Sequence, residues 1–344
     1  MRSPLPRGAV SAALLAMLPL SPNDATEPLD ELAELALTAV DHSADIVSDD
    51  DLQLSLFCLN ALHYSGIEGA SDSWEWNGPL CQVRATIESA FESALRDRVE
   101  APQRPPVVTR DAVAATLFAL AAADKAPSLS RYIASKASEV QLAEFLIHRS
   151  IYQLREADPH SWAIPRLTGA PKAALVEIQT DEYGGGRPER MHSELFAATM
   201  RGMGLDDSYG HYVDQVPAII LASVNMMSLF GLHRRLRGAI VGHLAAFEIT
   251  SSIPNRFYGN GFRRLGFSQL TDYFDEHVEA DAVHEQIAAR DLAGGLVESE
   301  PDLLDDVLFG AAACLAVDGW VAEHILGAWE VGEASLDHAA LAAV

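Results

Sequence analysis

The sequence predicts an all-α protein, and three observations support this fold class. Apolar residues recur at intervals of three and four from Leu29 onward, which is the period of a helix face. Stretches that alternate apolar and polar residues, as half-buried strands do, are nearly absent. Hydrophobic residues make up 49% of the 344 residues and charged residues 21%, a globular composition that can bury a substantial core. We therefore expect a bundle of helices around shared apolar faces.

The bounds of each predicted helix follow from where the apolar period starts and where capping residues, glycines or prolines stop it. In chain order, the predicted helices span residues 27–42, 50–63, 83–98, 110–124, 133–157, 165–182, 188–203, 216–231, 236–251, 269–293 and 301–329. The helix at 216–231 is apolar on nearly every face, which predicts that it is buried within the bundle.

The N-terminal residues resemble a secretory signal without completing one. Arg2 and Arg7 precede an apolar segment, Ala9–Leu20, in the order of a signal peptide. Pro19 interrupts that segment, and no small-x-small cleavage site appears before Asn23. We therefore expect a helical N-terminal arm of a cytoplasmic protein.

Charge and cysteine content limit the partners and the compartment. With 24 Lys and Arg against 49 Asp and Glu, the net charge is −25, which excludes nucleic acid because phosphates require a basic surface. No apolar run reaches the roughly 18 residues of a membrane span, so no membrane partner is expected. The cysteines are odd in number and lack paired spacing, which predicts reduced core thiols in a reducing compartment. They are Cys58, Cys81 and Cys314.

The segment 100–108 is the best candidate for a linker. It holds three prolines, which deny the backbone helical hydrogen bonds. We therefore divide the chain into an N-terminal helical region with its linker, residues 1–108, and a larger helical domain, residues 109–344. The N-terminal region is a candidate for the interface of a homodimer.

A carboxylate and an imidazole stand three residues apart at Glu189 and His192. Residues i and i+3 of a helix project from one face, so this pair could hold an ion, as Glu-x-x-His units do in di-iron bundle proteins. The same pair is also common on solvated helix faces. Gly184–Gly186 and Pro188 precede it, so we expect a helix break there, with Pro188 in the first turn of the next helix.

A second cluster consists of His277, Asp281 and His284, at positions i, i+4 and i+7 of one predicted helix. This spacing places three metal-competent side chains along one stripe. A charged surface stripe is the alternative, and the nearby Glu276 and Glu279 fit it. Mixed imidazole and carboxylate ligation suits iron or manganese, and the lack of a neighbouring cysteine excludes a structural zinc finger.

Two further acidic residues fit such a centre. A two-metal centre needs a carboxylate from another helix, and Glu156 near the end of the helix predicted at 133–157 is the candidate, with an ordinary surface glutamate as the alternative. Glu248 lies on a very apolar helix, where an unpaired buried charge is costly. It either contacts the substrate or supports the centre, or it forms a core salt bridge with an arginine of the segment 234–237. On the same helix, His243 is predicted to be a core histidine.

Together these elements resemble the haem-oxygenase-like di-iron oxidases and oxygenases, a family of iron-containing redox enzymes. The family pattern is a glutamate on an early helix, then Asp-Glu-Tyr-Gly, Glu-x-x-His and His-x-x-x-Asp-x-x-His. The matching residues are Glu156, Asp181–Gly184, Glu189, His192, His277, Asp281 and His284. The resemblance covers roughly residues 130–340, and it implies a haem-oxygenase-like helical bundle with an N-terminal helical extension and no haem.

The resemblance further implies a centre of two iron ions with seven ligands. One iron would be held by Glu156, His192 and His284, and the other by Glu189, His277 and Asp281. Glu182 would be the seventh ligand. Family members that oxidise nitrogen carry a glutamate at that position, whereas those that decarboxylate fatty acids or cleave lysine lack it.

The function that the resemblance implies is an O₂-dependent oxygenase with an external electron donor, either a reductase or a chemical reductant. Glu182 favours N-oxygenation of an amine or guanidine-type nitrogen in a small molecule of specialised metabolism, to a hydroxylamine, nitroso or nitro product. Oxidative C–C cleavage, decarboxylation or desaturation of an amino or fatty acid by the same centre is the alternative. A metal-binding structural protein without turnover is the non-enzymatic alternative.

Overall fold

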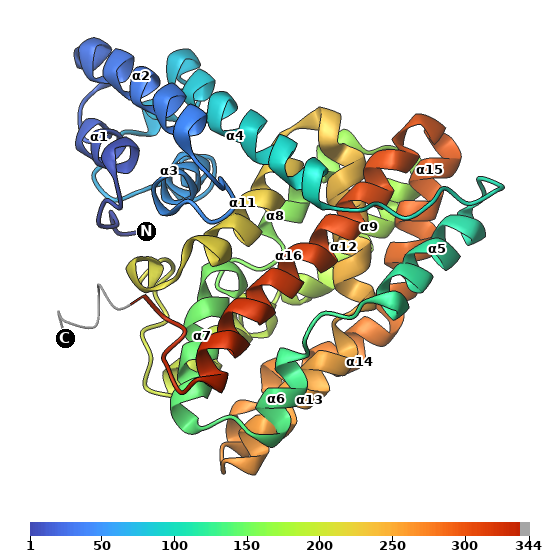
Figure 1. The fold of residues 1–344 in the computed structure, drawn as a ribbon. Coiled ribbons are helices and arrows are strands. Elements are labelled where there is room, and N and C mark those ends of the chain that lie inside the picture. The colour runs from blue at the N-terminus through green and yellow to red at the C-terminus, as the bar shows by residue number, and fades with distance from the viewer. Residues whose placement is uncertain (338–344) are drawn as a thin grey trace. The chain divides into compact units, whose positions relative to one another are not determined.

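The computed structural model describes residues 1–337, apart from the side chains of residues 280–282. Within this part of the chain the regular elements are helices and no strand occurs, so the predicted all-α class is confirmed (Figure 1). The chain divides into two compact units. Unit 1 consists of Met1–Arg98, Ser208–Met226 and the residues from Leu336 onward, and unit 2 consists of Val99–Asp207 and Met227–Ser335.

This division differs from the predicted one because unit 2 already starts at Val99, before the predicted boundary at residue 109, and because unit 1 also takes Ser208–Met226 and residues 336–337. The buried side chain of Asn225 shows why. Its Nδ2 donates to the backbone oxygen and to Oε1 of Gln53, both at 2.9 Å, and its Oδ1 accepts from Asn60 at 3.2 Å. Buried amides are stable only when they are hydrogen-bonded in this way. A pairing between residues this far apart in sequence leaves no local pattern.

Unit 1 contains α1 (Ala9–Met17), α2 (Thr26–His42), α3 (Asp50–Ala61), α4 (Gly78–Arg98) and the first part of α11 (Ala218–Leu232). The predicted N-terminal helix is present as α1. Asp51 accepts hydrogen bonds from the backbone N–H groups of Val10 and Ser11, at 2.8 and 2.7 Å, and so satisfies the start of this helix. Beyond its end, Trp74 Nε1 donates to the carbonyl oxygen of Leu18 at 3.1 Å. The N-terminal helix is therefore an integral part of unit 1.

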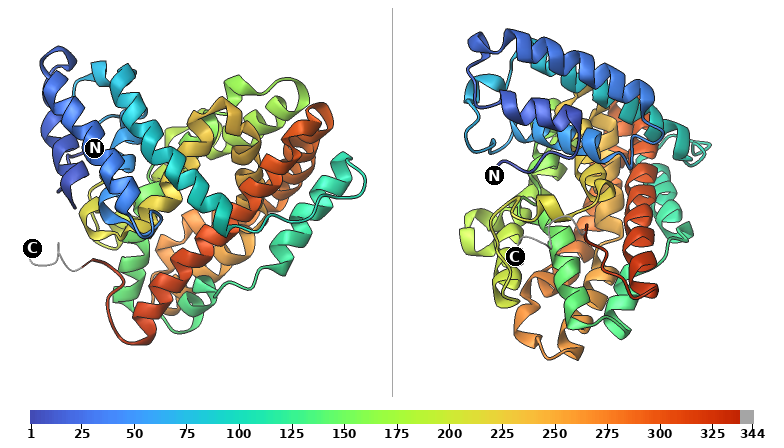
Figure 2. Two further views of the ribbon diagram at one scale, coloured as in Figure 1. Left: turned by 45° about the horizontal axis from the view of Figure 1, so that its top comes forward. Right: turned by 60° about the vertical axis from the view of Figure 1, so that its left-hand side comes forward.

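Unit 2 contains the helices that carry the candidate site. Figure 2 shows the helices of the chain in two further views. Its α-helices are α5 (Arg110–Ala123), α6 (Leu129–Ser135), α7 (Glu139–Gln153), α8 (Asp158–Ser161), α9 (Gly169–Glu182), α10 (His192–Gly202), the end of α11, α12 (Arg237–Ile249), α13 (Ser252–Arg264), α14 (Asp272–Gln286), α15 (Gly295–Ser299) and α16 (Leu304–Glu330). The helix predicted at 133–157 is divided, because Ser138 starts α7 with a capping box to Gln141. A π-helix, Ile287–Gly294, follows α14.

Helices α12 and α16 approach closely in the core of unit 2. A Cβ atom at Gly242 would lie 1.9 Å from the carbonyl oxygen of Val307, and one at Gly310 would lie 2.0 Å from that of Ala239. Only glycine allows two helix backbones to approach this closely. The contact fixes the position of α12, which carries Glu248.

Helix α13 was not predicted. The prediction ended one helix at 251 and began the next at 269, with Gly259, Gly261 and Gly266 between them. In the structure Gly259 and Gly261 lie inside α13, and a Cβ atom at Gly261 would lie 2.7 Å from the carbonyl oxygen of Ile133. Gly261 therefore permits close packing of α13 against α6 instead of breaking the helix.

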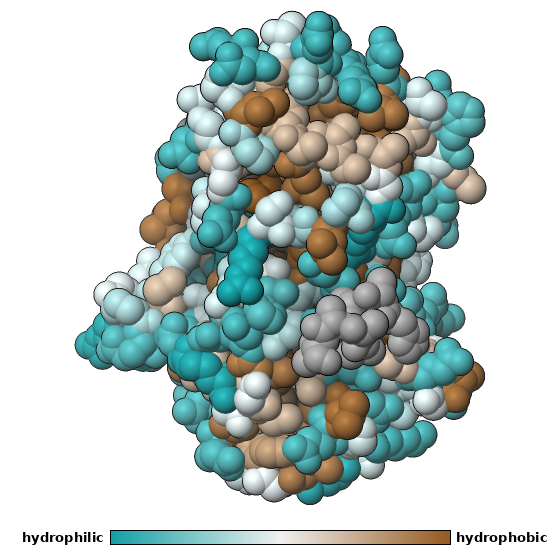
Figure 3. All heavy atoms as spheres, turned by 90° about the vertical axis from the view of Figure 1, so that its left-hand side faces the viewer, coloured by the Kyte–Doolittle hydropathy of each residue, from teal (hydrophilic) through white to brown (hydrophobic). Residues whose placement is uncertain are grey.

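The remaining features of the chain concern its surface and thiols. Among the described residues, no helix is both long enough and apolar enough to cross a membrane. Figure 3 shows one face, on which hydrophilic side chains surround separate hydrophobic patches. The three cysteines are free, and burial raises the pKa of the Cys58 thiol to about 12, which keeps it unreactive.

Candidate metal centre

Glu156 lies in the turn between α7 and α8 and not on a helix face. Next to it, Ala157 has a φ of 75°, the only positive φ among the described non-glycine residues. Such backbone strain persists where the surroundings enforce it. Here Gln179 Nε2 donates to the carbonyl oxygen of Ala157 at 2.9 Å, and the hydroxyl of Tyr273 donates to Glu156 Oε1 at 2.9 Å. These hydrogen bonds hold the Glu156 carboxylate in the interior, where the residue is 5% exposed.

Glu182 and His192 lie on either side of a break. Glu182 is the last residue of α9, and Gly184–Gly186 follow it with φ values of 67°, 61° and 79°. Only glycine adopts such values routinely, so the predicted break is confirmed. A helix starts at Pro188 as predicted, but it is the short 3₁₀ helix Pro188–Arg190, and the α-helix α10 begins only at His192. The break turns the chain back on itself, and His192 Nδ1 lies 3.0 Å from Glu182 Oε2.

His277 on α14 faces Glu156. Its Nδ1 donates to the backbone oxygen of Tyr273 at 2.8 Å, and since a carbonyl can only accept, Nδ1 carries the proton. Nε2, with its lone pair, therefore faces the interior, 3.5 Å from Glu156 Oε1. The rings of His277 and His192 lie 4.3 Å apart. Metal-binding histidines are oriented in this way by a hydrogen bond from the second nitrogen.

His284 lies two turns further along α14 and faces Glu248 of α12. Its Nε2 donates to Asp181 Oδ2 at 3.0 Å, which leaves Nδ1 directed at Glu248 Oε2, 3.6 Å away. Glu248 is 4% exposed and His284 is 2% exposed. Glu248 therefore pairs with His284, and Arg237, one of the arginines predicted as its partner, pairs with Glu300 instead.

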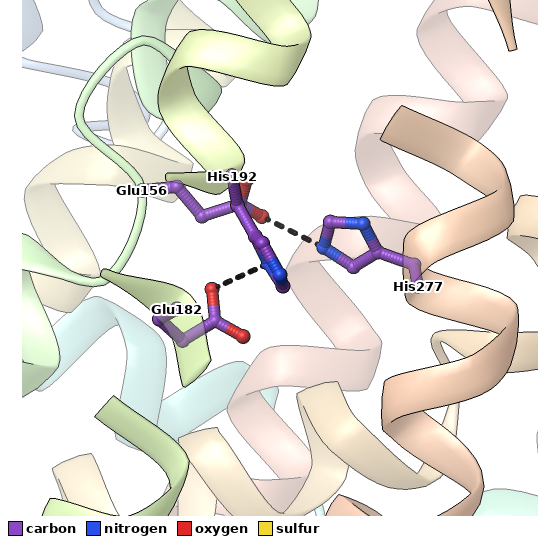
Figure 4. A group of neighbouring side chains, drawn as sticks. All are labelled: Glu156, Glu182, His192 and His277. Atoms are coloured by element: carbon purple, nitrogen blue, oxygen red, sulfur yellow. Dashed lines mark ion pairs between the residues drawn. The ribbon is translucent and has the colours of Figure 1, made fainter. Parts of the chain in front are cut away.

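These side chains form two groups whose donor atoms lie within 4.8 Å of one another. Site A, as we call the first, consists of Glu156, Glu182, His192 and His277 (Figure 4). Site B consists of Glu182, Glu248 and His284. All six residues are buried, and Glu182 belongs to both sites. The two sites are therefore adjacent, with one carboxylate between them.

Five of the residues predicted as ligands are thus brought together: Glu156, Glu182, His192, His277 and His284. Their grouping differs from the one that the resemblance implied, because His277 and not His284 joins Glu156 and His192. Glu189 joins neither group. It is exposed in the short 3₁₀ helix Pro188–Arg190, so it does not share a helix face with His192. The side chain of Asp281 lies outside the described residues. The ligand roles of Glu189 and Asp281 stay predictions.

Opposing charges determine the electrostatics of the two sites. Burial raises the pKa of Glu182, but His192, His277 and His284 lower it by more, so its net pKa is below the ordinary value. Burial lowers the pKa of His192, and the Glu182 carboxylate raises it by more. The pKa of His284 is about 9, because Glu248 and Asp181 outweigh the effect of burial. Each buried imidazole is therefore balanced by a carboxylate.

The histidine pair beside the sites behaves differently. His160 Nε2 and His243 Nδ1 lie 3.1 Å apart and share a hydrogen bond. Burial lowers the pKa of His243 to about 3, and that of His160 also lies well below its ordinary value. His243 is therefore a neutral, hydrogen-bonded core histidine, as predicted.

The donor atoms fit an iron ion. Among the described residues, Glu156 Oε2 is buried without a hydrogen-bond partner, and His192 Nδ1 lies 3.0 Å from Glu182 Oε2. A buried carboxylate oxygen that accepts no hydrogen bond is what a metal ion satisfies. Imidazole nitrogens combined with carboxylate oxygens suit iron, as in di-iron bundle proteins.

A cavity adjoins both sites. Glu156, Glu182 and Glu248 contribute carboxylates to its lining, and the side chains of Tyr152 and Phe247 contribute aromatic surface. Neither Lys nor Arg occurs among the described residues that line it. The cavity therefore offers hydrogen-bond acceptors and apolar surface, but no cation.

Sequence reasoning missed the residues that support the ligands. Tyr273 lies four residues before His277, one helical turn away, and Asp181 precedes Glu182 within the Asp-Glu-Tyr-Gly segment. Their positions next to predicted ligands were the sequence features that could have identified them as supporting residues. Glu248 was recognised as a buried acid in need of a partner, but not as a possible ligand.

The helical fold and the buried sites define a class, namely helical proteins with a candidate metal centre of histidines and carboxylates. Residues 143–319 match the family described as iron-containing redox enzyme. The chain belongs to this family, and the resemblance seen in its motifs is confirmed. It is also 25% identical, over 222 residues, to the nitrosourea synthase of Streptomyces achromogenes subsp. streptozoticus. That match covers 64% of this chain and 47% of the synthase, so the chain spans about half the length of that relative.

Proposed function

We propose that this protein is a non-haem di-iron oxygenase that uses O₂ and external electrons to oxidise an amine or guanidine-type nitrogen. Two adjacent sites that share Glu182 support a pair of ions. Membership of an iron-containing redox family supports iron as the metal. Similarity to an enzyme named for nitrosourea synthesis supports nitrogen as the atom oxidised.

The cavity lining is the observation that carries the choice of substrate. Three carboxylates line it, and neither Lys nor Arg occurs among its described lining residues. The proposal assigns those carboxylates to the metal ions, so they do not themselves select the charge of the substrate. A fatty acid or a free amino acid would find no basic side chain in the lining to pair with its carboxylate, whereas an amine or guanidine nitrogen needs none. The lack of a basic anchor therefore favours N-oxygenation over the decarboxylation or desaturation alternative.

In this proposal the ligands divide between the two ions. Glu156, His192 and His277 would hold one ion, Glu248 and His284 would hold the other, and Glu182 could serve either. Iron, when bound, supplies the redox chemistry with O₂.

Supporting residues fix the ligands in place. Tyr273 positions Glu156 by its hydroxyl and His277 by its backbone oxygen, while Asp181 fixes the tautomer of His284. Asp281 lies three residues before His284 in sequence, so it is the first further ligand to test, followed by Glu189.

The test is reconstitution with Fe²⁺ under anaerobic conditions, metal analysis, and then exposure to ¹⁸O₂ with a reductant. We expect about two iron ions per chain, as in bundle di-iron proteins. Alkylamines and alkylguanidines should gain ¹⁸O on nitrogen by mass spectrometry, while fatty acids of equal length should not react. Retention of iron without any oxidised product would support the metal-binding, non-enzymatic alternative. Oxidation confined to the fatty acids would overturn the assignment to nitrogen.

A further inference from the structure

Gln179 lines the cavity but belongs to neither site. It lies on α9, three residues before Glu182, so the two side chains project from the same face of the helix. Gln179 is 3% exposed. Its position places an uncharged polar group next to the carboxylate that the two sites share.

The orientation of the Gln179 amide is determined by its partners. Nε2 donates to the carbonyl oxygen of Ala157 at 2.9 Å and to Oγ of Ser161 at 2.7 Å. A carbonyl oxygen can only accept, so the amide nitrogen must face Ala157 and the amide cannot be reversed. Both N–H groups are used in these two bonds. Oε1 is therefore held on the other side of the amide.

Gln179 Oε1 is buried and has no hydrogen-bond partner among the residues that the structure describes. Leaving a buried amide oxygen unpaired is unfavourable, and native proteins rarely do so without a functional reason. The oxygen is a pure acceptor, so the group that satisfies it must be a donor. An N–H group matches it, whereas a carboxylate or an ether oxygen does not.

We propose that Gln179 Oε1 accepts a hydrogen bond from an N–H group of the substrate and holds that nitrogen beside the shared ligand Glu182. This inference rests on the proposed N-oxygenase function and adds the residue that recognises the substrate nitrogen. The substrate class is an alkylamine or alkylguanidine, whose N–H groups meet Gln179 while its alkyl chain contacts Leu244 and Phe247 of the lining. Gln179 discriminates against substrates that present only acceptors.

The experiment measures binding, not turnover, on Zn²⁺-loaded protein by isothermal titration calorimetry. The probes are butylguanidinium, which carries N–H groups, and butyltrimethylammonium, a cation of similar chain length without any N–H. Gln179→Met removes the acceptor at nearly constant volume. We expect it to weaken butylguanidinium binding about tenfold, the usual effect of one lost hydrogen bond to a charged group. Binding of butyltrimethylammonium should change less than twofold, about the limit that calorimetry resolves.

Control variants separate recognition from support of the Ala157 turn. Ser161→Ala removes one acceptor of Nε2 but keeps Oε1, and should leave butylguanidinium binding unchanged. Gln179→Glu loses the donors, as Gln179→Met does, but keeps an acceptor oxygen. If both Gln179 variants lose zinc to the same extent, Gln179→Glu should still bind butylguanidinium more tightly than Gln179→Met. Equal binding by these two variants, or wild-type binding by Gln179→Met, would overturn the inference.

The outcomes also separate this inference from the proposed function. Binding that depends on Gln179, in a protein that oxidises no nitrogen, would retain the recognition site and reject the N-oxygenase. If the protein oxidises nitrogen but Gln179→Met binds butylguanidinium as tightly as the wild type does, the N-oxygenase function would be retained and the recognition role of Gln179 would be rejected.

Discussion

Sites A and B share Glu182 but differ in how their other ligands are supported. In site A, Glu156 is held by the buried hydroxyl of Tyr273, a residue that is 4% exposed. In site B, His284 is held by Asp181, whose side chain is 61% exposed. A hydrogen bond in the dry interior is stronger than one to a carboxylate that water can reach. We therefore expect site A, which has the more deeply buried support as well as one more ligand, to bind metal more tightly than site B.

The largest expected effect comes from the residue that the two sites share. Glu182→Ala should weaken metal binding at both sites by more than about 100-fold, since loss of a supporting residue alone costs 10- to 100-fold. A stepwise Co²⁺ titration followed by absorption measures the two affinities. Glu177→Ala, an exposed residue of the same helix, is the matched control. If either site kept its wild-type affinity, Glu182 would not be shared.

Tyr273→Phe tests the support of site A. It removes the hydroxyl that donates to Glu156 but keeps the aromatic ring and the backbone oxygen that fixes His277. We expect site A to lose about 10- to 100-fold in Co²⁺ affinity and site B to keep its own. Tyr258→Phe removes a hydroxyl elsewhere in unit 2 and should alter neither titration step. Equal losses at both sites would show that the sites are not supported separately.

Acid should destabilise the metal-free protein through His243, which lies on α12 with Glu248 of site B. Its pKa is about 3 in the folded protein and ordinarily 6.5, because burial disfavours the charged form. As the pH falls, the unfolded chain therefore takes up a proton on this residue before the folded protein does. The stability that neutral His243 contributes is complete above pH 6.5 and is lost as the pH falls toward 3.

For this histidine, the free energy of unfolding should change with pH by up to about 1.4 kcal/mol per pH unit. Urea unfolding at pH 7.5 and pH 5.5 measures it, and His243→Asn should reduce the difference between the two values. An unchanged difference in the variant would mean that His243 already takes up a proton in the folded protein.

The smallest effect is expected at the exposed support of site B. Asp181→Asn keeps an oxygen that accepts from His284 but removes the charge, and solvent already screens that charge. Co²⁺ affinity at site B should fall less than about tenfold, below the loss caused at site A by Tyr273→Phe. A larger loss than in Tyr273→Phe would reverse the ranking of the two supports.

The candidate ligands were predictable from the sequence to the extent that their spacing was local. His277 and His284 are seven residues apart on one helix, so their common stripe followed from helix geometry. The glycines before Glu189 predicted the break correctly. The predicted common helix face of Glu189 and His192 is absent because of the same break, since residues three apart share a face only if one helix contains both.

Contacts between distant segments could not be predicted in the same way. Glu248 becomes part of site B because the close approach of Gly242 to α16 positions α12. The hydrogen bonds between Asn225 and Gln53 place the first part of α11 in unit 1. Helix α13 was not predicted, and the close approach of its Gly261 to Ile133 of α6 joins residues far apart in sequence. Each of these outcomes depends on a partner many residues away.

The sequence by itself determined the helical class, the iron-type ligand chemistry and most of the residues that meet, because periodicity and residue type act over a few neighbouring positions. Tertiary structure alone decided that His277 joins His192, that Glu182 belongs to both sites and that Gln179 turns an unpaired oxygen away from its partners. Those relations are distances between side chains on different helices, and packing fixes them only when the whole unit folds.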